Sequence, residues 1–308
     1  MTCIGIHVGK NRDFLLSNQA RRCARATIAA TMITSPPNMT ATTATQAAPQ
    51  APQQAADLIW SLWQSRGHLD HLPPALRPAT RAAGYAIQAC HEQRSARPLF
   101  GWKIAATSTA GQQHIQVDGP LAGRILAERV IANDGTINLT GNQMRVVEGE
   151  FAFRMARDLP PRAAPYTRAE VVAAIATLHP AIEVPDSRFK PFEAAGAAQL
   201  IADNACTDYF LLGAAAPEAW RNLDLVHHNV TAQLKGGAQF TGSGINVLGD
   251  PLLALTWIAN ELSGIGVTLK KDQAVTTGTC FKPFAVAPGD AVEIDFGVIG
   301  RVGVRFTG

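Results

Sequence analysis

Hydrophobic positions recur with helical spacing in several segments, which we expect to form helices. These segments are 57–67, 80–92, 108–116, 167–178 and 250–264. In the first segment, Leu58, Ile59 and Leu62 fall on one face of a helix. The fourth opens with Thr167 and Glu170 in the spacing of a capping box, and the last opens with an aspartate followed by a proline, a common helix start.

Other segments have the alternation or the short apolar run of a β-strand. They are 99–105, 144–155, 179–185, 226–234, 239 onward, 273–277, 291–296 and 301–306. Gly236 and Gly237 predict a hairpin turn between the fourth and fifth of these strands. Because strands and helices do not alternate regularly, the pattern indicates an α+β fold with a mixed sheet and argues against a doubly wound sheet.

The first 55 residues differ from the remainder in composition. Residues 34–54 are a tract of Pro, Thr, Ala and Gln that cannot bury enough apolar surface to offset the entropy of ordering. We therefore expect residues 1–55 to be a disordered extension, either a transit peptide or the product of a start assigned too early, with Met32 or Met39 as the true first residue. Residues 56–308 are expected to form one catalytic domain, helical over 56–98 and β-rich over 99–308.

Charge and composition exclude several classes of protein. The formal net charge is +3, but residues 1–55 contain five cations and one anion, which leaves 22 cationic and 23 acidic residues in the domain. The domain thus has no basic excess for nucleic acid. No apolar run approaches the ~20 residues that span a bilayer, so no membrane partner is expected. The five cysteines lie far apart, which argues against disulfides and zinc and favours a reducing, cytoplasmic location.

Two glutamates on the strand expected at 144–155 place like charges close together. Glu148 and Glu150 lie on one face of the strand, with Cα atoms about 7 Å apart. Like charges at that separation repel each other unless a positive group lies between them. Gly149, between them, leaves room for a ligand or another segment to approach the backbone.

A third glutamate, Glu183, stands between Ile182 and Val184 in an apolar strand. A buried carboxylate without a partner is costly, and three carboxylates that face one point could share a hard cation such as Mg²⁺ or Mn²⁺. The alternative is that each glutamate is a solvated residue on a half-exposed sheet. Spacing in the sequence does not by itself decide between these two interpretations.

The chain from about Leu99 to Phe306 resembles the 2-keto-4-pentenoate hydratase group of the fumarylacetoacetate hydrolase superfamily. The matching segments, in order, are 101–105, 116–120, 148–150, 181–188, 201–205, 249–254 with Trp257 and Asn260, 276–279 and 287–290. The resemblance implies a rolled, barrel-like mixed β-sheet with flanking helices, of the type found in the C-terminal domain of that superfamily. It also implies Mg²⁺ or Mn²⁺ on Glu148, Glu150 and Glu183.

Further site residues follow from the resemblance. Lys103 corresponds to a lysine beside the metal-bound substrate, where it would either transfer a proton or clamp a carboxylate, and Thr277 and Thr279 lie in the loop that contacts the substrate carboxylate. Asp118 is expected at the substrate, but the family's second acid in this segment is replaced by Leu121.

Other polar residues leave alternatives open. Arg188 either binds a substrate carboxylate or pairs with a nearby acid. Asp203 and Asn204 either orient a metal-bound water or cap a helix. His227 and His228 are expected on opposite faces of a strand, so they cannot share one metal.

The function that the resemblance implies is a metal-dependent hydro-lyase of bacterial aromatic catabolism. It would add water to a 2-hydroxy-2,4-dienoate, a small 2-oxo acid precursor, to form a 4-hydroxy-2-oxo acid. The alternatives are decarboxylation of a 4-oxalocrotonate-like acid, hydrolytic C–C cleavage of an acylpyruvate, and a non-catalytic assembly partner. The apolar C-terminal half, rich in potential sheet edges, favours a homo-oligomer.

Overall fold

The computed structural model describes residues 50–308, so residues 1–49 of the extension expected at residues 1–55 lie outside this range. The first helix, α1, spans Gln50–Ser65, so the boundary expected between residues 55 and 56 falls inside it. Gln and Ala are good helix formers, and Pro52 sits in the first turn, where a missing N–H costs little. The Gln/Ala composition that resembled a disordered tract is therefore compatible with the helix.

The larger sheet has eight strands and holds most of the polar residues of interest. Its main path runs in the order β2-β1-β10-β5-β6-β7-β3, with β11 paired to β5. The strands are β1 (Gly101–Ala105), β2 (Leu121–Ile125), β3 (Val130–Ile131), β5 (Val146–Met155), β6 (Ile175–Val184), β7 (Tyr209–Leu212), β10 (Ala274–Thr279) and β11 (Phe284–Ala285). Parallel and antiparallel pairs are mixed, as expected for an α+β protein.

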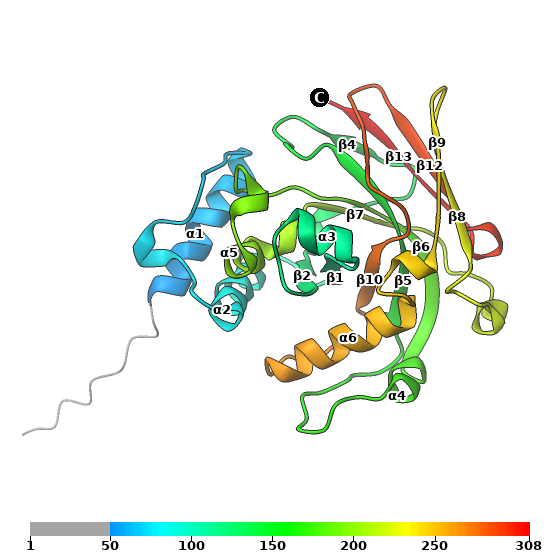
Figure 1. Cartoon of the computed structure of the whole chain (residues 1–308), viewed down its shortest axis with the longest axis horizontal. Coiled ribbons are helices and arrows are strands. Elements are labelled where there is room, and N and C mark those ends of the chain that lie inside the picture. The colour runs from blue at the N-terminus through cyan, green and yellow to red at the C-terminus, as the bar shows by residue number, and fades with distance from the viewer. Residues whose placement is uncertain (1–49) are drawn as a thin grey trace, which may run out of the picture. The chain divides into compact units, whose positions relative to one another are not determined.

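The second sheet has five strands in the order β4-β13-β12-β8-β9. These strands are β4 (Thr136–Asn138), β8 (Asn229–Leu234), β9 (Gln239–Ser243), β12 (Ala291–Asp295) and β13 (Arg301–Thr307). The expected hairpin joins β8 to β9, and Gly236 in its turn has φ = 73°. Figure 1 shows the strands of this sheet beside β5 and β6 of the larger one.

The strand β5 packs differently on its two faces. Phe151 meets the ring of Phe296, which follows β12, edge-on at 5.3 Å between centroids. Alternation turns Glu148, Glu150 and Ala152 to the other face. One face of β5 thus contributes to the apolar layer between the sheets, and the opposite face carries the acidic residues.

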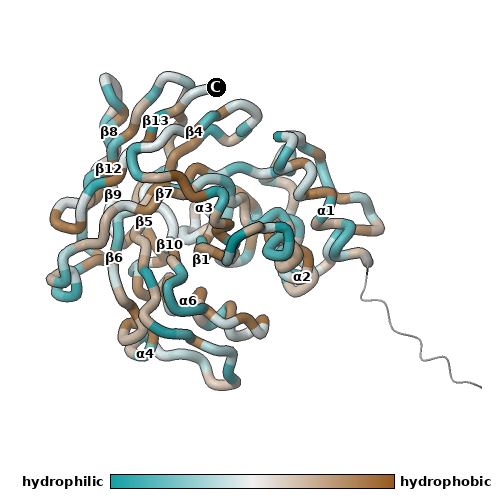
Figure 2. Tube along the Cα trace, turned by 180° about the vertical axis from the view of Figure 1, so that it is seen from behind, coloured by the Kyte–Doolittle hydropathy of each residue, from teal (hydrophilic) through white to brown (hydrophobic). Residues whose placement is uncertain are grey.

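Helices cover the remaining surfaces of the larger sheet. At the N-terminal side, α1 packs on α2 (Arg81–Glu92), and α2 packs on α5 (Ala197–Ala202) (Figure 1). On another side, α6 (Pro251–Gly264) lies on β10 and on α4 (Arg168–Val172). A short helix, α3 (Thr109–His114), follows β1. Hydrophobic segments gather in the interior, and the connecting loops at the edge are mostly hydrophilic (Figure 2).

Two details differ from the sequence expectations. The helix expected over 167–178 begins at its Thr167 capping box but ends at Val172, and residues from Ile175 onward belong to β6. Pairing of Leu178 with Phe153 of β5 extends the sheet there and outweighs the helical spacing. The strand expected from residue 226 begins at Asn229, so His227 and His228 precede it rather than alternate within it.

In the described range, residues 50–308, none of the helices is both long enough and apolar enough to span a membrane.

Candidate metal centre

Strand pairing brings the three glutamates together. In the register of β5 and β6, Glu148 lies directly opposite Glu183, and Glu150 follows two residues along the same face. One oxygen from each of the three carboxylates lies within 4.8 Å of the others. The tertiary structure therefore selects the convergent arrangement over three separate solvated residues.

Burial makes this arrangement electrostatically unfavourable by itself. Glu150 and Glu183 are 0% and 1% exposed, and Glu148 is half-buried. Glu150 Oε2 accepts hydrogen bonds from the Thr276 hydroxyl and, at 2.6 Å, from the Gly278 N–H. Within residues 50–308, no group donates a hydrogen bond to Glu150 Oε1 or to either oxygen of Glu183. Three buried acceptor atoms thus lack donors, which is rare in folded proteins.

The raised pKa values of the three carboxyl groups reflect the same cost of burying negative charge. Burial raises the pKa of Glu148 to about 7, and the neighbouring Glu183 adds to the shift. Burial, with the charge of Glu148, raises the pKa of Glu150 to about 7. The pKa of Glu183 rises to about 8 through burial, although Lys103 opposes the shift. Without a cation the trio holds protons near neutral pH.

A hard divalent cation fits these residues. Its charge would offset the repulsion, and the oxygens without donors are the ligand type that Mg²⁺ and Mn²⁺ prefer. The partial exposure of Glu148 leaves this side of the site open to water or to a ligand. We therefore assign Glu148, Glu150 and Glu183 as the candidate metal centre.

Lys103 adjoins the centre from β1. Its Nζ lies 3.0 Å from Glu183 Oε1 and donates a hydrogen bond of 2.9 Å to the Ala205 carbonyl oxygen. Burial lowers the pKa of this lysine, but the charges of Glu183 and Glu148 outweigh burial, so its pKa is raised. In the absence of a cation these surroundings favour the charged form of Lys103.

Two glycines make room for this geometry. A Cβ on Gly123, which pairs with Lys103, would lie 3.0 Å from the lysine Cδ and 2.6 Å from the Asn204 carbonyl oxygen. A Cβ on Gly149 would lie 2.7 Å from the ring of Phe281. The close approach expected at Gly149 therefore comes from a packed aromatic ring.

The Thr-Gly-Thr loop contributes to the metal centre by binding Glu150, but through atoms that the sequence analysis did not identify. The Thr277 hydroxyl donates to the Phe151 carbonyl at 2.9 Å, and Thr279 donates to the Phe281 carbonyl at 2.7 Å. Thr276 and the backbone of Gly278 are the groups that hold Glu150. The sequence signal for Thr276 was its place in the matched 276–279 segment, but strand alternation around the irregular register of β10 could not be read from that segment.

Arg188 is fully enclosed by protein groups. It forms an ion pair with Asp203, and its Nη1 donates to the Asp186 and Thr207 carbonyls at 3.0 Å each. Of its two expected roles, the structure shows the pairing with a nearby acid. Asp203 precedes a 3-10 helix, Asn204–Cys206, without making a side-chain capping bond to it. Its side chain binds Arg188, and the side chain of Asn204 binds the backbone of Arg124 on β2.

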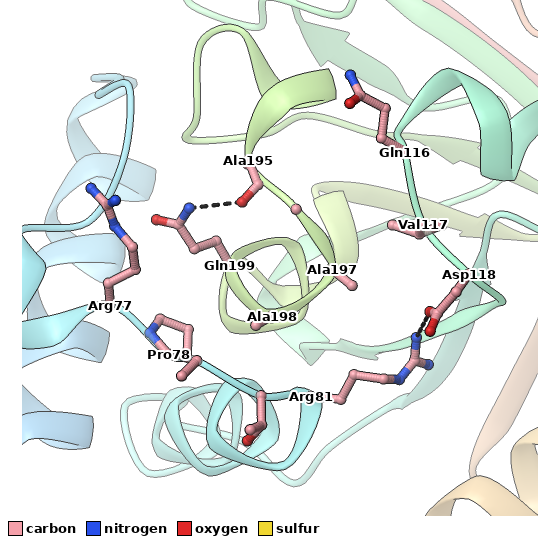
Figure 3. Close-up of a pocket in the computed structure, with 13 residues that line it drawn as sticks. Arg77, Pro78, Arg81, Gln116, Val117, Asp118, Ala195, Ala197, Ala198 and Gln199 are labelled. Atoms are coloured by element: carbon pink, nitrogen blue, oxygen red, sulfur yellow. Dashed lines mark hydrogen bonds and ion pairs between the residues drawn. The ribbon is translucent and has the colours of Figure 1, made fainter.

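Asp118 lies apart from the glutamates, in a cavity of about 450 Å³ between the start of α2, the loop after α3 and the start of α5 (Figure 3). Its side chain is 84% exposed and forms an ion pair with Arg81 at 3.3 Å. None of the three glutamates lines this cavity. Leu121, by contrast, is fully buried on β2, on the strand face that carries Gly123 opposite Lys103.

Comparison with known proteins finds relatives that are named as hydratases. A search of protein-family models found none that matches. The chain is 30% identical over 256 residues to a 2-keto-4-pentenoate hydratase of Paraburkholderia xenovorans strain LB400, covering 82% of this chain and 94% of the relative. It is 28% identical over 218 residues to a 2-hydroxyhexa-2,4-dienoate hydratase of Comamonas testosteroni, covering 70% of this chain and 81% of the relative.

A solved structure shows the same fold. The 4-oxalocrotonate decarboxylase from Pseudomonas putida G7, complexed with magnesium and adipate, superposes with a TM-score of 0.76 over 85% of this chain and 99% of that protein, at 24% identity. The rolled mixed sheet expected from the sequence is thereby confirmed. The chain belongs to the 2-keto-4-pentenoate hydratase and 4-oxalocrotonate decarboxylase group of the fumarylacetoacetate hydrolase superfamily.

Proposed function

We propose that this protein is a metal-dependent hydratase that adds water to a 2-hydroxy-2,4-dienoate to form a 4-hydroxy-2-oxo acid. The observation that carries the proposal is the convergence of Glu148, Glu150 and Glu183, with three buried oxygens that lack donors. The names of the relatives at about 30% identity favour hydration. We take the substrate to be a small 2-oxo or 2-hydroxydienoic acid, bound without nucleic acid or membrane.

A bound Mg²⁺ or Mn²⁺ would supply positive charge to the carboxylate and the 2-oxygen of such an acid, stabilising the negative charge that develops during ketonisation. The protein side chains then have to hold the cation and place the substrate. The glutamates carry out the first task. We assign the second to Lys103 and to Thr279, the partly buried threonine at the end of the loop that holds Glu150.

Proton transfer is assigned to Lys103. An ammonium group has three N–H donors. One donates to the Ala205 carbonyl, and the Nζ atom also lies at the ion-pair distance of 3.0 Å from Glu183 Oε1. We assign a remaining N–H to a substrate atom. Since Leu121 offers no acid on this face of β2, Lys103 is the group we propose to deliver the proton that the distal carbon gains during ketonisation, before water adds to the neighbouring carbon.

The test is turnover of 2-hydroxypenta-2,4-dienoate by the purified chain with Mg²⁺. Loss of the dienol absorbance, with 4-hydroxy-2-oxopentanoate as the product, is expected for a hydratase. A parallel incubation with 4-oxalocrotonate tests the decarboxylase alternative, for which stoichiometric CO₂ is the readout. Cleavage of an acylpyruvate would indicate the hydrolase alternative.

The control separates chemistry from binding. Lys103→Met removes the ammonium group and keeps an unbranched apolar stem, so it should abolish turnover while the glutamates remain. If the wild-type chain turns over none of these acids and does not bind Mg²⁺, every enzymatic assignment is wrong, and the non-catalytic partner is the remaining alternative.

A further inference from the structure

Three consecutive residues after α5 adopt a left-handed backbone conformation. Asn204, Ala205 and Cys206 have φ of 58°, 52° and 61°, and all three are buried. Asn tolerates this conformation, but Ala and Cys rarely adopt it, because their Cβ atoms crowd the backbone. Such a turn persists only where its surroundings hold it, and turns of this kind cluster at functional sites.

The side chain of Asn204 ties the turn to β2. Its Oδ1 accepts from the Arg124 N–H and its Nδ2 donates to the Arg124 carbonyl, both at 2.7 Å. Arg124 follows Gly123, the residue that pairs with Lys103 across the sheet. The amide therefore fixes the turn to the strand beside the lysine.

Arg188 braces the turn at both ends. Its guanidinium donates to the carbonyl of Asp203, before the turn, and at 3.0 Å to the carbonyl of Thr207, after it. Arg188 belongs to the segment that leaves β6 a few residues after Glu183. The strand that carries a candidate metal ligand thus also supports the turn.

These contacts hold one carbonyl group of the turn toward Lys103. The Ala205 carbonyl, at the centre of the turn, accepts the 2.9 Å hydrogen bond from Lys103 Nζ. With Glu183 Oε1 at 3.0 Å, this contact leaves the ammonium group with little rotational freedom. In a right-handed or extended conformation, the same carbonyl would point elsewhere.

We propose that the Asn204–Cys206 turn is a positioning device that aims the Ala205 carbonyl at Lys103 and so directs the remaining N–H of the ammonium group toward the substrate. Asn204 is the positioning residue, since its side chain bonds to the backbone of Arg124 and acts on Lys103 through the turn. The catalytic part of this inference rests on the function proposed above, whereas the effect of the turn on Lys103 does not.

The experiment compares Asn204→Ala with the matched variant Asn260→Ala in the full chain with Mg²⁺. Asn260 on α6 makes the same paired bonds to a backbone, with the Tyr166 N–H at 2.6 Å and the Tyr166 carbonyl at 3.0 Å. For Asn204→Ala we expect kcat to fall about 10- to 100-fold, with KM and Mg²⁺ affinity retained. Asn260→Ala should lose comparable thermal stability but keep its kcat.

A second readout does not depend on turnover. Amine-selective labelling followed by peptide mass spectrometry reports the reactivity of Lys103, with the lysines at 270 and 282 as internal references. Labelling of Lys103 should rise several-fold in Asn204→Ala and stay at the wild-type level in Asn260→Ala. A wild-type rate of labelling together with a wild-type kcat in Asn204→Ala would overturn the proposal.

Asn204→Gly covers the case in which Asn204→Ala does not fold. Glycine adopts the left-handed conformation without a Cβ penalty but cannot make the bonds to Arg124, so the untethered turn should again raise Lys103 labelling and lower kcat. Wild-type values for both in this folded variant would also refute the inference. If the wild-type chain turns over no dienoate, the proposed function fails, while the labelling comparison still tests the turn.

Discussion

At the scale of single residues, the site is defined by charges that the protein alone does not compensate. Glu150 receives two hydrogen bonds on one oxygen, whereas Glu183 has only the nearby Lys103 ammonium group. The raised pKa values, the buried oxygens without a hydrogen-bond donor among the described residues and the closeness of the carboxylates all result from the same uncompensated negative charge. A cation removes the imbalance, and two measurements follow from this.

Replacing Glu150 with glutamine should separate fold from metal binding. In Glu150→Gln the like-charge repulsion decreases, so the metal-free variant should melt at or above the wild-type temperature. Saturating Mg²⁺, at about 100 times the dissociation constant, should stabilise the wild type by about 2.7 kcal/mol and the variant by far less. Thermal melting with and without Mg²⁺ checks this, with the exposed Glu293→Gln as the control. If Mg²⁺ raised the melting temperature of Glu150→Gln as much as that of Glu293→Gln, the result would count against the site.

The Mg²⁺ effect should also depend on pH. Carboxyl groups with pKa values raised to about 7 and 8 contribute stability to the metal-free fold at low pH and lose it as pH rises through those values. The cation needs the charged forms and competes with protons. We therefore expect the stabilisation by Mg²⁺ to be greater at pH 8 than at pH 6, measured by melting in matched buffers. If Mg²⁺ raised the melting temperature equally at pH 6 and pH 8, the result would contradict the raised pKa values.

At the scale of elements, strand register is the decisive property. Glu183 opposes Glu148 only because β6 pairs with β5 in the observed register, and a slip by one residue would turn it to the other face. The same pairing converts the second half of an expected helix, from Ile175 to Leu178, into strand. Local helical spacing could not predict this, since the gain comes from a partner strand distant in the sequence.

Close packing at Gly149 is expected to hold that register. In Gly149→Ala, the new Cβ would meet the Phe281 ring at 2.7 Å and Ile294 Cδ1 at 3.0 Å. Overpacking of this kind should cost about 1–3 kcal/mol of unfolding free energy, measured by urea denaturation. Gly264→Ala, at the end of α6, should change stability little, because the added carbon has no atom of the described residues within 4 Å apart from its chain neighbours and the nearby backbone of its own helix. Similar losses in the two variants would mean that Gly149 is not closely packed.

At the scale of the whole described region, the helical N-terminal part is joined to the sheet through a buried acid. Asp208, 0% exposed, accepts from the Trp63 indole at 2.8 Å and from Arg66 at 2.6 Å. These contacts connect α1 to the residue that precedes β7. The helices and the sheet should therefore unfold together.

Removing that acid tests the connection. Asp208→Ala removes the acceptor of the buried Trp63 indole N–H and the ion-pair partner of the half-buried Arg66. A buried donor left without an acceptor costs about 1–3 kcal/mol. Denaturant unfolding, followed by tryptophan fluorescence and by circular dichroism, should show a lower midpoint with coincident transitions. Asp224→Ala, which removes an exposed acid bonded to His227, is the control. Two separate transitions in the wild type would show that the helices unfold independently.

The amino-acid sequence by itself determined the class of fold, most helices and strands, the shared face of Glu148 and Glu150, and the family. These properties depend on local periodicity, capping and ordered motifs, which can be read along one segment at a time. The tertiary structure alone decided that Glu183 faces Glu148, that Arg188 pairs with Asp203, and that Asp118 lies in a separate cavity. Those outcomes depend on strand register, burial and long-range pairing, and the free energy of each comes from residues far apart in the chain.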